Sequence, residues 1–101
     1  MIKKILILTT LLCTSFISVA DEKMAKEKNC FACHQMEKKL VGPSFKQISE
    51  KYQGDNKAKE LLTKKVVGGS SGVWGAVPMP ANKITPQEAD QLITWILNFK
   101  S

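Results

Sequence analysis

The chain has 101 residues and a formal net charge of +6, and all fifteen of its basic residues are lysines. A chain this short allows one small domain, and the lack of arginine argues against nucleic-acid binding despite the positive charge. It has three cysteines and one histidine, too few for a disulfide-rich scaffold or a complete Cys/His zinc site.

The first twenty residues, "MIKKILILTTLLCTSFISVA", have the pattern of a secretory signal peptide. Lys3 and Lys4 precede an apolar run, and small residues at 18 and 20 precede the expected cut before Asp21. The apolar run, about 15 residues, is short for the ~20 that a membrane-spanning helix needs. We therefore predict that residues 1–20 are removed, that residues 21–101 form one periplasmic domain, and that no membrane span remains.

Four segments of the mature chain read as helix, and none shows the alternation of a strand. The first covers about residues 22–28. The second, "SFKQISEKYQG", opens with a capping box of Ser44 and Gln47 and stops at Gly54. The third covers about residues 56–67, with apolar residues at helical spacing.

The fourth helix, "TPQEADQLITWILNFK", has the clearest pattern. Thr85 is its N-cap, Pro86 its first residue, and Glu88 completes a capping box before a continuous apolar stripe. Residues 68–84, "GGSSGVWGAVPMPANKI", contain four glycines and two prolines and are too irregular for a helix. A long loop in so small a domain is usually functional or disordered, and its apolar side chains favour function. The chain is predicted to be all-α with one long, shaped loop.

Cys30, Cys33 and His34 form the motif "CFACH". A zinc site lacks partner ligands here, and a thioredoxin-like site needs a β-strand pattern that the sequence does not show. C-x-x-C-H is the attachment signature of c-type haem: two thiols one turn apart can bond one edge of the porphyrin, while the next histidine faces the iron. A covalently held cofactor also supplies the core that 81 residues could not build alone. We predict one haem c, attached through Cys30 and Cys33 and ligated by His34.

The sixth iron ligand is expected to be Met79. With the only histidine used, the mature chain offers three methionines. Met36 is too near the histidine to reach the opposite face of the haem, and Met24 lies in the first helix at a position expected to pack in the core. Met79 lies between Pro78 and Pro80, which hold the backbone extended. A methionine presented so rigidly favours ligation over gap filling.

The motifs "CFACH", "VGPSF" and "GSSGVWGAVPMPAN" and the C-terminal amphipathic helix together resemble the short bacterial class I cytochromes c, the c-551/c-552 group. The likeness covers nearly all of residues 22–100. It implies a small class I cytochrome c fold, about four helices wrapped around one covalently bound haem, with the long loop that bears the methionine before the C-terminal helix. It also implies an electron carrier that is not an enzyme.

The resemblance assigns three further residues to the haem site. Pro43 would offer its carbonyl to the far ring nitrogen of His34, which would fix the imidazole. Trp74 would donate its indole N–H to a haem propionate, although a core aromatic is an equally open interpretation. Asn82 would hydrogen-bond near the Met79 sulfur, although a turn residue is the alternative.

An iron held by His34 and Met79 has no open position, so we expect a one-electron carrier cycling between Fe(II) and Fe(III). A haem-based small-ligand binder or sensor stays open if Met79 is not stably bound, as does an electron-transfer subunit of an oxidoreductase complex. The apolar lining of the haem pocket is expected from Leu40, Val41, Phe45, Ile48, Leu61, Leu62, Val77, Leu92 and Ile96.

The expected partners are redox proteins: a terminal oxidase, a nitrite reductase or a cytochrome bc-type donor, in keeping with the resemblance. We expect a monomer whose lysines meet an acidic docking surface and steer the encounter. The alternative is that these lysines simply solvate helix faces. The lysines clustered around the haem motif are Lys23, Lys26, Lys28, Lys38 and Lys39.

Overall fold

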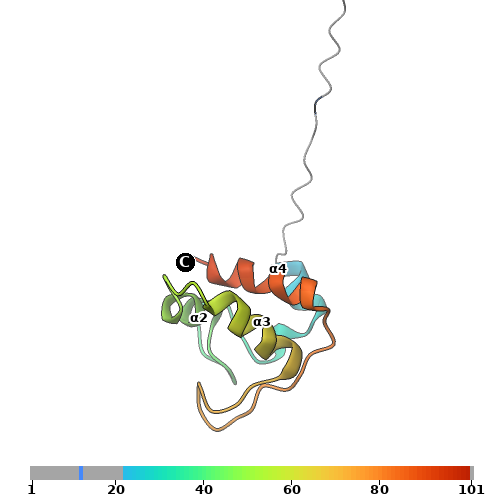
Figure 1. Cartoon of the computed structure of the whole chain (residues 1–101). Helices are drawn as coiled ribbons and strands as arrows, with labels where there is room; N and C mark the ends of the chain where they lie inside the picture. The colour runs from blue at the N-terminus through green and yellow to red at the C-terminus, as the bar shows by residue number, and fades with distance from the viewer. Residues whose placement is uncertain (1–11, 13–21, 101) are drawn as a thin grey trace, which may run out of the picture.

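The structure is a computed structural model that describes Leu12 and residues 22–100 (Figure 1). This part of the chain forms four helices and no sheet, as predicted. They are α1 (Glu22–Glu27), α2 (Phe45–Lys51), α3 (Ala58–Gly68) and α4 (Pro86–Leu97), with a 3₁₀ turn, η1 (Cys30–Ala32), that the sequence did not predict. The signal peptide predicted for residues 1–20 lies, apart from Leu12, outside the described residues. No helix in the described part is long and apolar enough to cross a membrane.

Both predicted capping boxes are present. The Ser44 hydroxyl accepts from the Gln47 backbone N–H at 3.0 Å, and the Gln47 side chain accepts from the Ser44 N–H at 2.9 Å. Thr85 and Glu88 make the same reciprocal pair at 3.1 Å and 3.1 Å. Because these bonds satisfy amide groups that a helix start leaves open, α2 and α4 begin where the sequence places them. α3 begins two residues later than predicted and includes Gly68.

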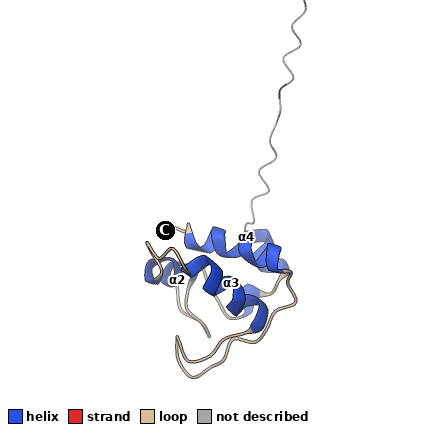
Figure 2. Ribbon diagram, viewed as in Figure 1, coloured by secondary structure: helices blue, strands red, loops and turns tan. Residues whose placement is uncertain are grey.

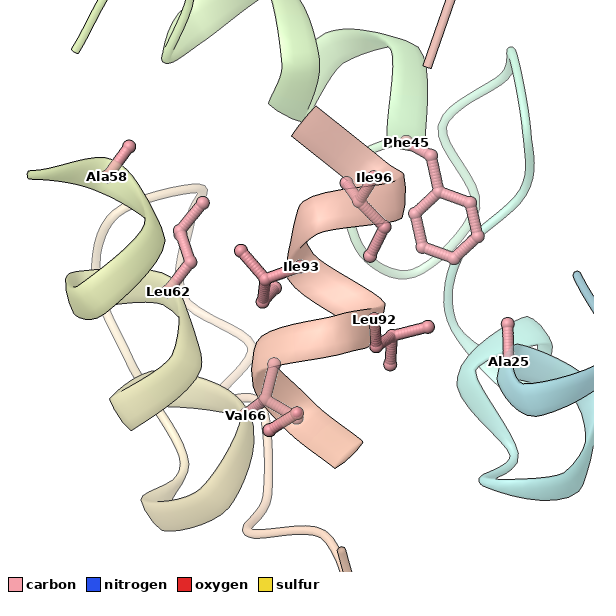
Figure 3. Close-up of a cluster of buried hydrophobic side chains, with 9 residues drawn as sticks. Ala25, Phe45, Ala58, Leu62, Val66, Leu92, Ile93 and Ile96 are labelled. Carbon is pink, nitrogen blue, oxygen red and sulfur yellow. The ribbon is translucent and has the colours of Figure 1, made fainter. Parts of the chain in front are cut away.

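The hydrophobic core is built around the buried stripe of α4. Figure 3 shows Leu92, Ile93 and Ile96 on α4 between the side chains of α3 and the ring of Phe45 at the start of α2. Leu92 and Phe45 are each 1% exposed. The buried core consists of Ala25, Phe45, Ala58, Leu62, Val66, Ala89, Leu92, Ile93 and Ile96.

Contacts between distant segments fix the helices around α4. The Lys28 ammonium lies 3.1 Å from the Glu88 carboxylate and joins the chain just after α1 to the first turn of α4. At the other end, the Ser49 hydroxyl of α2 lies 3.0 Å from the carbonyl oxygens of both Leu97 and Phe99. Figure 2 shows the loop between α3 and α4 extending away from this helical layer. The site lies between the helices and the loops.

Candidate haem-binding site

A cavity of about 240 Å³ lies between the helices and two loops, one between η1 and α2 and one between α3 and α4. Its walls come from the segment after η1, from one side of α2, α3 and α4, and from residues 70–80 of the loop before α4. Seven of the nine predicted lining residues are in these walls: Val41, Phe45, Ile48, Leu62, Val77, Leu92 and Ile96. Leu40 and Leu61 are instead exposed, 47% and 44%, and lie outside the described lining.

The turn η1 presents Cys30, Cys33 and His34 to this cavity. The backbone N–H groups of Cys33 and His34 both donate to the Cys30 carbonyl, at 3.2 Å and 2.9 Å. Asn29, with φ of 60°, turns the chain from α1 into η1, and asparagine is one of the few side chains that tolerate this region. Burial raises the pKa of the Cys30 thiol, although a hydrogen bond with its own backbone offsets part of this. The thiol is therefore uncharged at neutral pH.

The His34 imidazole is held in one orientation. Its Nδ1 lies 2.6 Å from the carbonyl oxygen of Pro43, a buried residue. A carbonyl oxygen can only accept a hydrogen bond, so Nδ1 donates to it, and Nε2 is the ring nitrogen left for a ligand in the cavity. The Phe45 ring stacks on the imidazole with centroids 5.6 Å apart and planes at 21°. His34 is therefore oriented so that Nε2 is the nitrogen available to bind iron.

Gly42 is a site residue that the sequence analysis missed. A Cβ at this position would lie 2.7 Å from His34 Cε1, 3.0 Å from Nδ1 and 3.3 Å from Nε2. Only a glycine lets the backbone come this close to the ring. The signal was visible in the quoted "VGPSF", but the glycine could not be tied to the histidine without the fold.

Met79 lies in the cavity wall, and its backbone is paired with the start of the loop. The N–H of Met79 donates to the Ser70 carbonyl at 2.7 Å, and the N–H of Ser70 donates to the Met79 carbonyl at 2.9 Å. Gly69, with φ of 84°, makes this possible, since a Cβ there would meet the Met79 carbonyl oxygen at 2.9 Å. Met24, Met36 and Met79 all pack against the hydrophobic core. Of the three methionines in the described part, Met79 is the one in the lining.

Asn82 ties the loop to the end of α3. Its backbone N–H donates to the Val66 carbonyl at 3.2 Å, and its side-chain amide donates to the carbonyls of Val66 at 3.1 Å and Pro80 at 3.3 Å. These bonds hold the residues directly after Met79. A hydrogen bond from Asn82 to the Met79 sulfur stays a prediction.

Trp74 lines the cavity and is 39% exposed. The described lining also contains two lysines, Lys39 and Lys65, and no Asp or Glu. The sequence analysis placed Lys39 near the haem motif but missed Lys65. Two cations and an indole in a mostly apolar wall are suited to an apolar ligand that carries carboxylates.

The predicted lysine cluster is only partly a free positive surface. Lys26 pairs with Glu22 at 3.8 Å, and Lys28 pairs with Glu88 at 3.1 Å. Their charges are therefore partly neutralised by neighbouring carboxylates. Lys38 and Lys39 are exposed, and Lys39 also borders the cavity.

The residues present fit a c-type haem. Two thiols and an imidazole lie at the turn, a thioether lies in the loop, and the wall carries two cations that match the two propionates of the porphyrin. Among the described residues, no three His, Cys, Asp or Glu side chains converge as a metal-ion site. Cys30, Cys33 and His34 have the C-x-x-C-H spacing of a c-type haem site.

Fold and site together define a class I cytochrome c, and comparison with known proteins agrees. The cytochrome c family matches residues 22–100, and the chain belongs to it. It is 46% identical to cytochrome c-552 of Hydrogenobacter thermophilus, over 83% of this chain and 86% of that protein. It is 38% identical to cytochrome c-551 of Pseudomonas aeruginosa, over 90% of this chain and 88% of that protein. The crystal structure of wild-type Nitrosomonas europaea cytochrome c552 superposes with a TM-score of 0.76 at 48% identity, covering 79% of this chain and 100% of that one.

These similarities confirm the resemblance and the fold. Cys30, Cys33 and His34 form the haem-binding motif of the family. The relatives are small cytochromes c, which carry electrons and are not enzymes. The chain is accordingly a haem-bearing protein of electron transport whose partners are redox proteins.

Proposed function

We propose that residues 21–101 form a periplasmic one-electron carrier with a single haem c, ligated by His34 and Met79. The observation that carries this proposal is that both side chains line one apolar cavity from segments far apart in sequence. Each segment is fixed by backbone hydrogen bonds, His34 to Cys30 and Met79 to Ser70. Such fixed ligands would change little between oxidation states, which favours electron transfer over chemistry at the metal.

The chain's own residues would set the ligation and the potential. When bound, haem supplies an iron that exchanges one electron between its ferrous and ferric states. His34 would bind it through Nε2, because Nδ1 is committed to the Pro43 carbonyl. Met79 would contribute a soft thioether sulfur, which favours the ferrous state and raises the potential. With haem bound, the apolar walls would keep water from much of the ring and so disfavour the extra charge of the ferric state.

Three predicted residues would support this arrangement. Pro43 would keep His34 oriented through the 2.6 Å contact. Asn82 would restrain Met79 through its bonds to the end of α3. Trp74 would donate its indole N–H to a propionate.

The visible spectrum of the mature protein tests the ligation. We expect sharp bands in the reduced form and, in the oxidised form, the weak far-red band of methionine-ligated ferric haem. Met79→Ala should abolish the far-red band, while Met36→Ala, outside the cavity lining, should keep it. A wild-type haem spectrum without the band would refute Met79 as ligand and favour a small-ligand binder or sensor. Failure to acquire haem during expression with the attachment machinery would refute the whole proposal.

The charge around the cavity supports steering by an acidic partner, such as a terminal oxidase, a nitrite reductase or a cytochrome bc-type donor. Because Lys39 is exposed beside the cavity, its charge adds to the field that a docking partner meets. Electron-transfer rates with an acidic partner should fall as salt rises. Lys39→Gln should lower the rate at low salt more than Lys57→Gln, a lysine outside the lining. Rates that do not change with salt would refute steering.

Export and free diffusion are proposed on the sequence of residues 1–20. Mass spectrometry of the protein from the periplasmic fraction should give a chain that begins at Asp21. Size-exclusion chromatography should give a monomer, as expected of a free carrier. Co-purification in a fixed ratio with an oxidoreductase would instead favour a subunit of a complex.

A further inference from the structure

The loop that carries Met79 is tied down firmly only at its base. There, Ser70 pairs with Met79 and Asn82 bonds to the Val66 carbonyl. Residues 71–78 are all exposed, and within the described part of the chain they make no backbone hydrogen bond to another segment. A segment with few such bonds opens readily, so its tip needs a side-chain contact to stay closed.

Lys51, the last residue of α2, makes such a contact. Its ammonium nitrogen lies 5.4 Å from the ring centroid of Trp74, near the tip of the loop, and 5.7 Å from the ring centroid of Tyr52. Both distances are within the range of about 6 Å at which an ammonium is attracted to the face of an aromatic ring. One cation thus bridges a ring of the helical framework and a ring of the loop.

The framework side of this contact is rigid. α2 begins at Phe45, which is 1% exposed, and its Ser49 hydroxyl lies 3.0 Å from the Leu97 carbonyl at the end of α4 and from the Phe99 carbonyl just beyond it. The ammonium also sits at the C-terminal end of α2, where the helix dipole favours a positive charge. Lys51 is therefore held by a fixed helix, and it contacts a loop that has few backbone hydrogen bonds of its own. Tyr52 and Trp74 both line the cavity, so the bridge crosses its edge.

We propose that Lys51 is a positioning residue for Met79: by bridging Tyr52 and Trp74, it holds the loop closed over the haem cavity. This inference rests on the proposed ligation by Met79. Lys51 contacts the ring of Trp74 and not Met79 itself, so it acts on Met79 through Trp74. Loss of the cation leaves the base of the loop paired and lets the tip open more often.

The size of the effect follows from the strength of an exposed cation–π contact. Such a contact shifts an opening equilibrium about two- to fivefold. Lys51→Met keeps the apolar stem and removes the charge. Lys51→Arg keeps a cation that binds aromatic faces at least as well and should behave like the wild type. Lys46→Met removes the same charge from the first turn of the same helix, away from both rings, and is the matched control.

Two measurements on the haem-loaded protein test this proposal. The first is the rate at which added imidazole displaces Met79 in the ferric protein, followed by loss of the far-red band. The second is hydrogen exchange of the Met79 amide, whose bond to Ser70 must open with the loop. Both rates should rise about two- to fivefold in Lys51→Met and stay at the wild-type value in Lys46→Met and Lys51→Arg.

The outcomes separate this inference from the proposed function. Equal rates in Lys51→Met and wild type, with the far-red band present, would overturn the role of Lys51 and leave Met79 as ligand. Equal acceleration in Lys51→Met and Lys46→Met would overturn it too, because the effect would then be one of net charge. A wild type without the far-red band would refute ligation by Met79, while amide exchange would still show whether Lys51 holds the loop.

Discussion

Replacing Gly42 by alanine should displace the His34 imidazole and destabilise the protein. The added Cβ would lie 2.7 Å from Cε1, whereas carbon atoms pack at about 3.5 Å or more, so ring or backbone must move by about 0.8 Å. The ring cannot swing away freely, because its Nδ1 is bonded to the Pro43 carbonyl at 2.6 Å. Overpacking of this kind costs about 1–3 kcal/mol. In a domain of this size each kcal/mol lowers Tm by about 4–8 °C, so the expected fall is about 4–24 °C.

The assay is thermal unfolding of the haem-loaded protein, followed by the visible absorption of the reduced form. The control is Gly68→Ala, at the last residue of α3, where an added Cβ has nothing within 4 Å. Gly-to-Ala changes at such permissive positions stabilise by about 0.4–1 kcal/mol, so the two variants should move Tm in opposite directions. A Gly42→Ala protein with the Tm and spectrum of the wild type would refute the close approach of Gly42 and His34.

Two further predictions concern the first turn and the centre of α4. Hydrogen bonds with the Thr85 backbone first, and with the Lys28 side chain second, lower the folded-state pKa of Glu88. Its carboxylate therefore stabilises the fold at neutral pH, and this contribution is lost as pH falls through the folded-state pKa. The gap in urea midpoint between wild type and Glu88→Gln should be present at neutral pH and vanish in acid; a gap of constant size would contradict this. Leu92→Ala should cost about 2–5 kcal/mol in denaturant unfolding, since Leu92 is 1% exposed. Leu61→Ala, at a side chain that is 44% exposed, should cost about 0.5 kcal/mol, and equal losses would refute this placement of the core.

Structural features that depend on residues close together in the sequence were predictable. The capping boxes of α2 and α4 join residues three apart, so the sequence alone located both helix starts. The start of α3 was placed two residues early because its N-cap, Lys57, makes no side-chain cap bond that a pattern could reveal. The turn η1 was missed since three residues are too few to show a period.

Charge was harder to interpret than helix starts. The pairing of Lys26 with Glu22 is an i,i+4 contact that the sequence could have suggested. Lys28 pairs with Glu88, sixty residues away, and only the packing of the chain around α4 brings them together. The expected lysine cluster is therefore smaller than the sequence implied. Of its members only Lys39 is in the described cavity lining, where Lys65, which is outside the cluster, adds a second charge.

The sequence by itself determined the cofactor, because Cys30, Cys33 and His34 are within one turn of each other and their chemistry is set by local spacing. It also marked Met79, since the flanking prolines act on the backbone beside them. The tertiary structure decided which contacts surround these side chains: Gly42 lies beside the His34 imidazole, and Lys51 lies against Trp74 in the loop that carries Met79. Those contacts join residues that only packing brings together, and no local pattern encodes a distance across a folded chain.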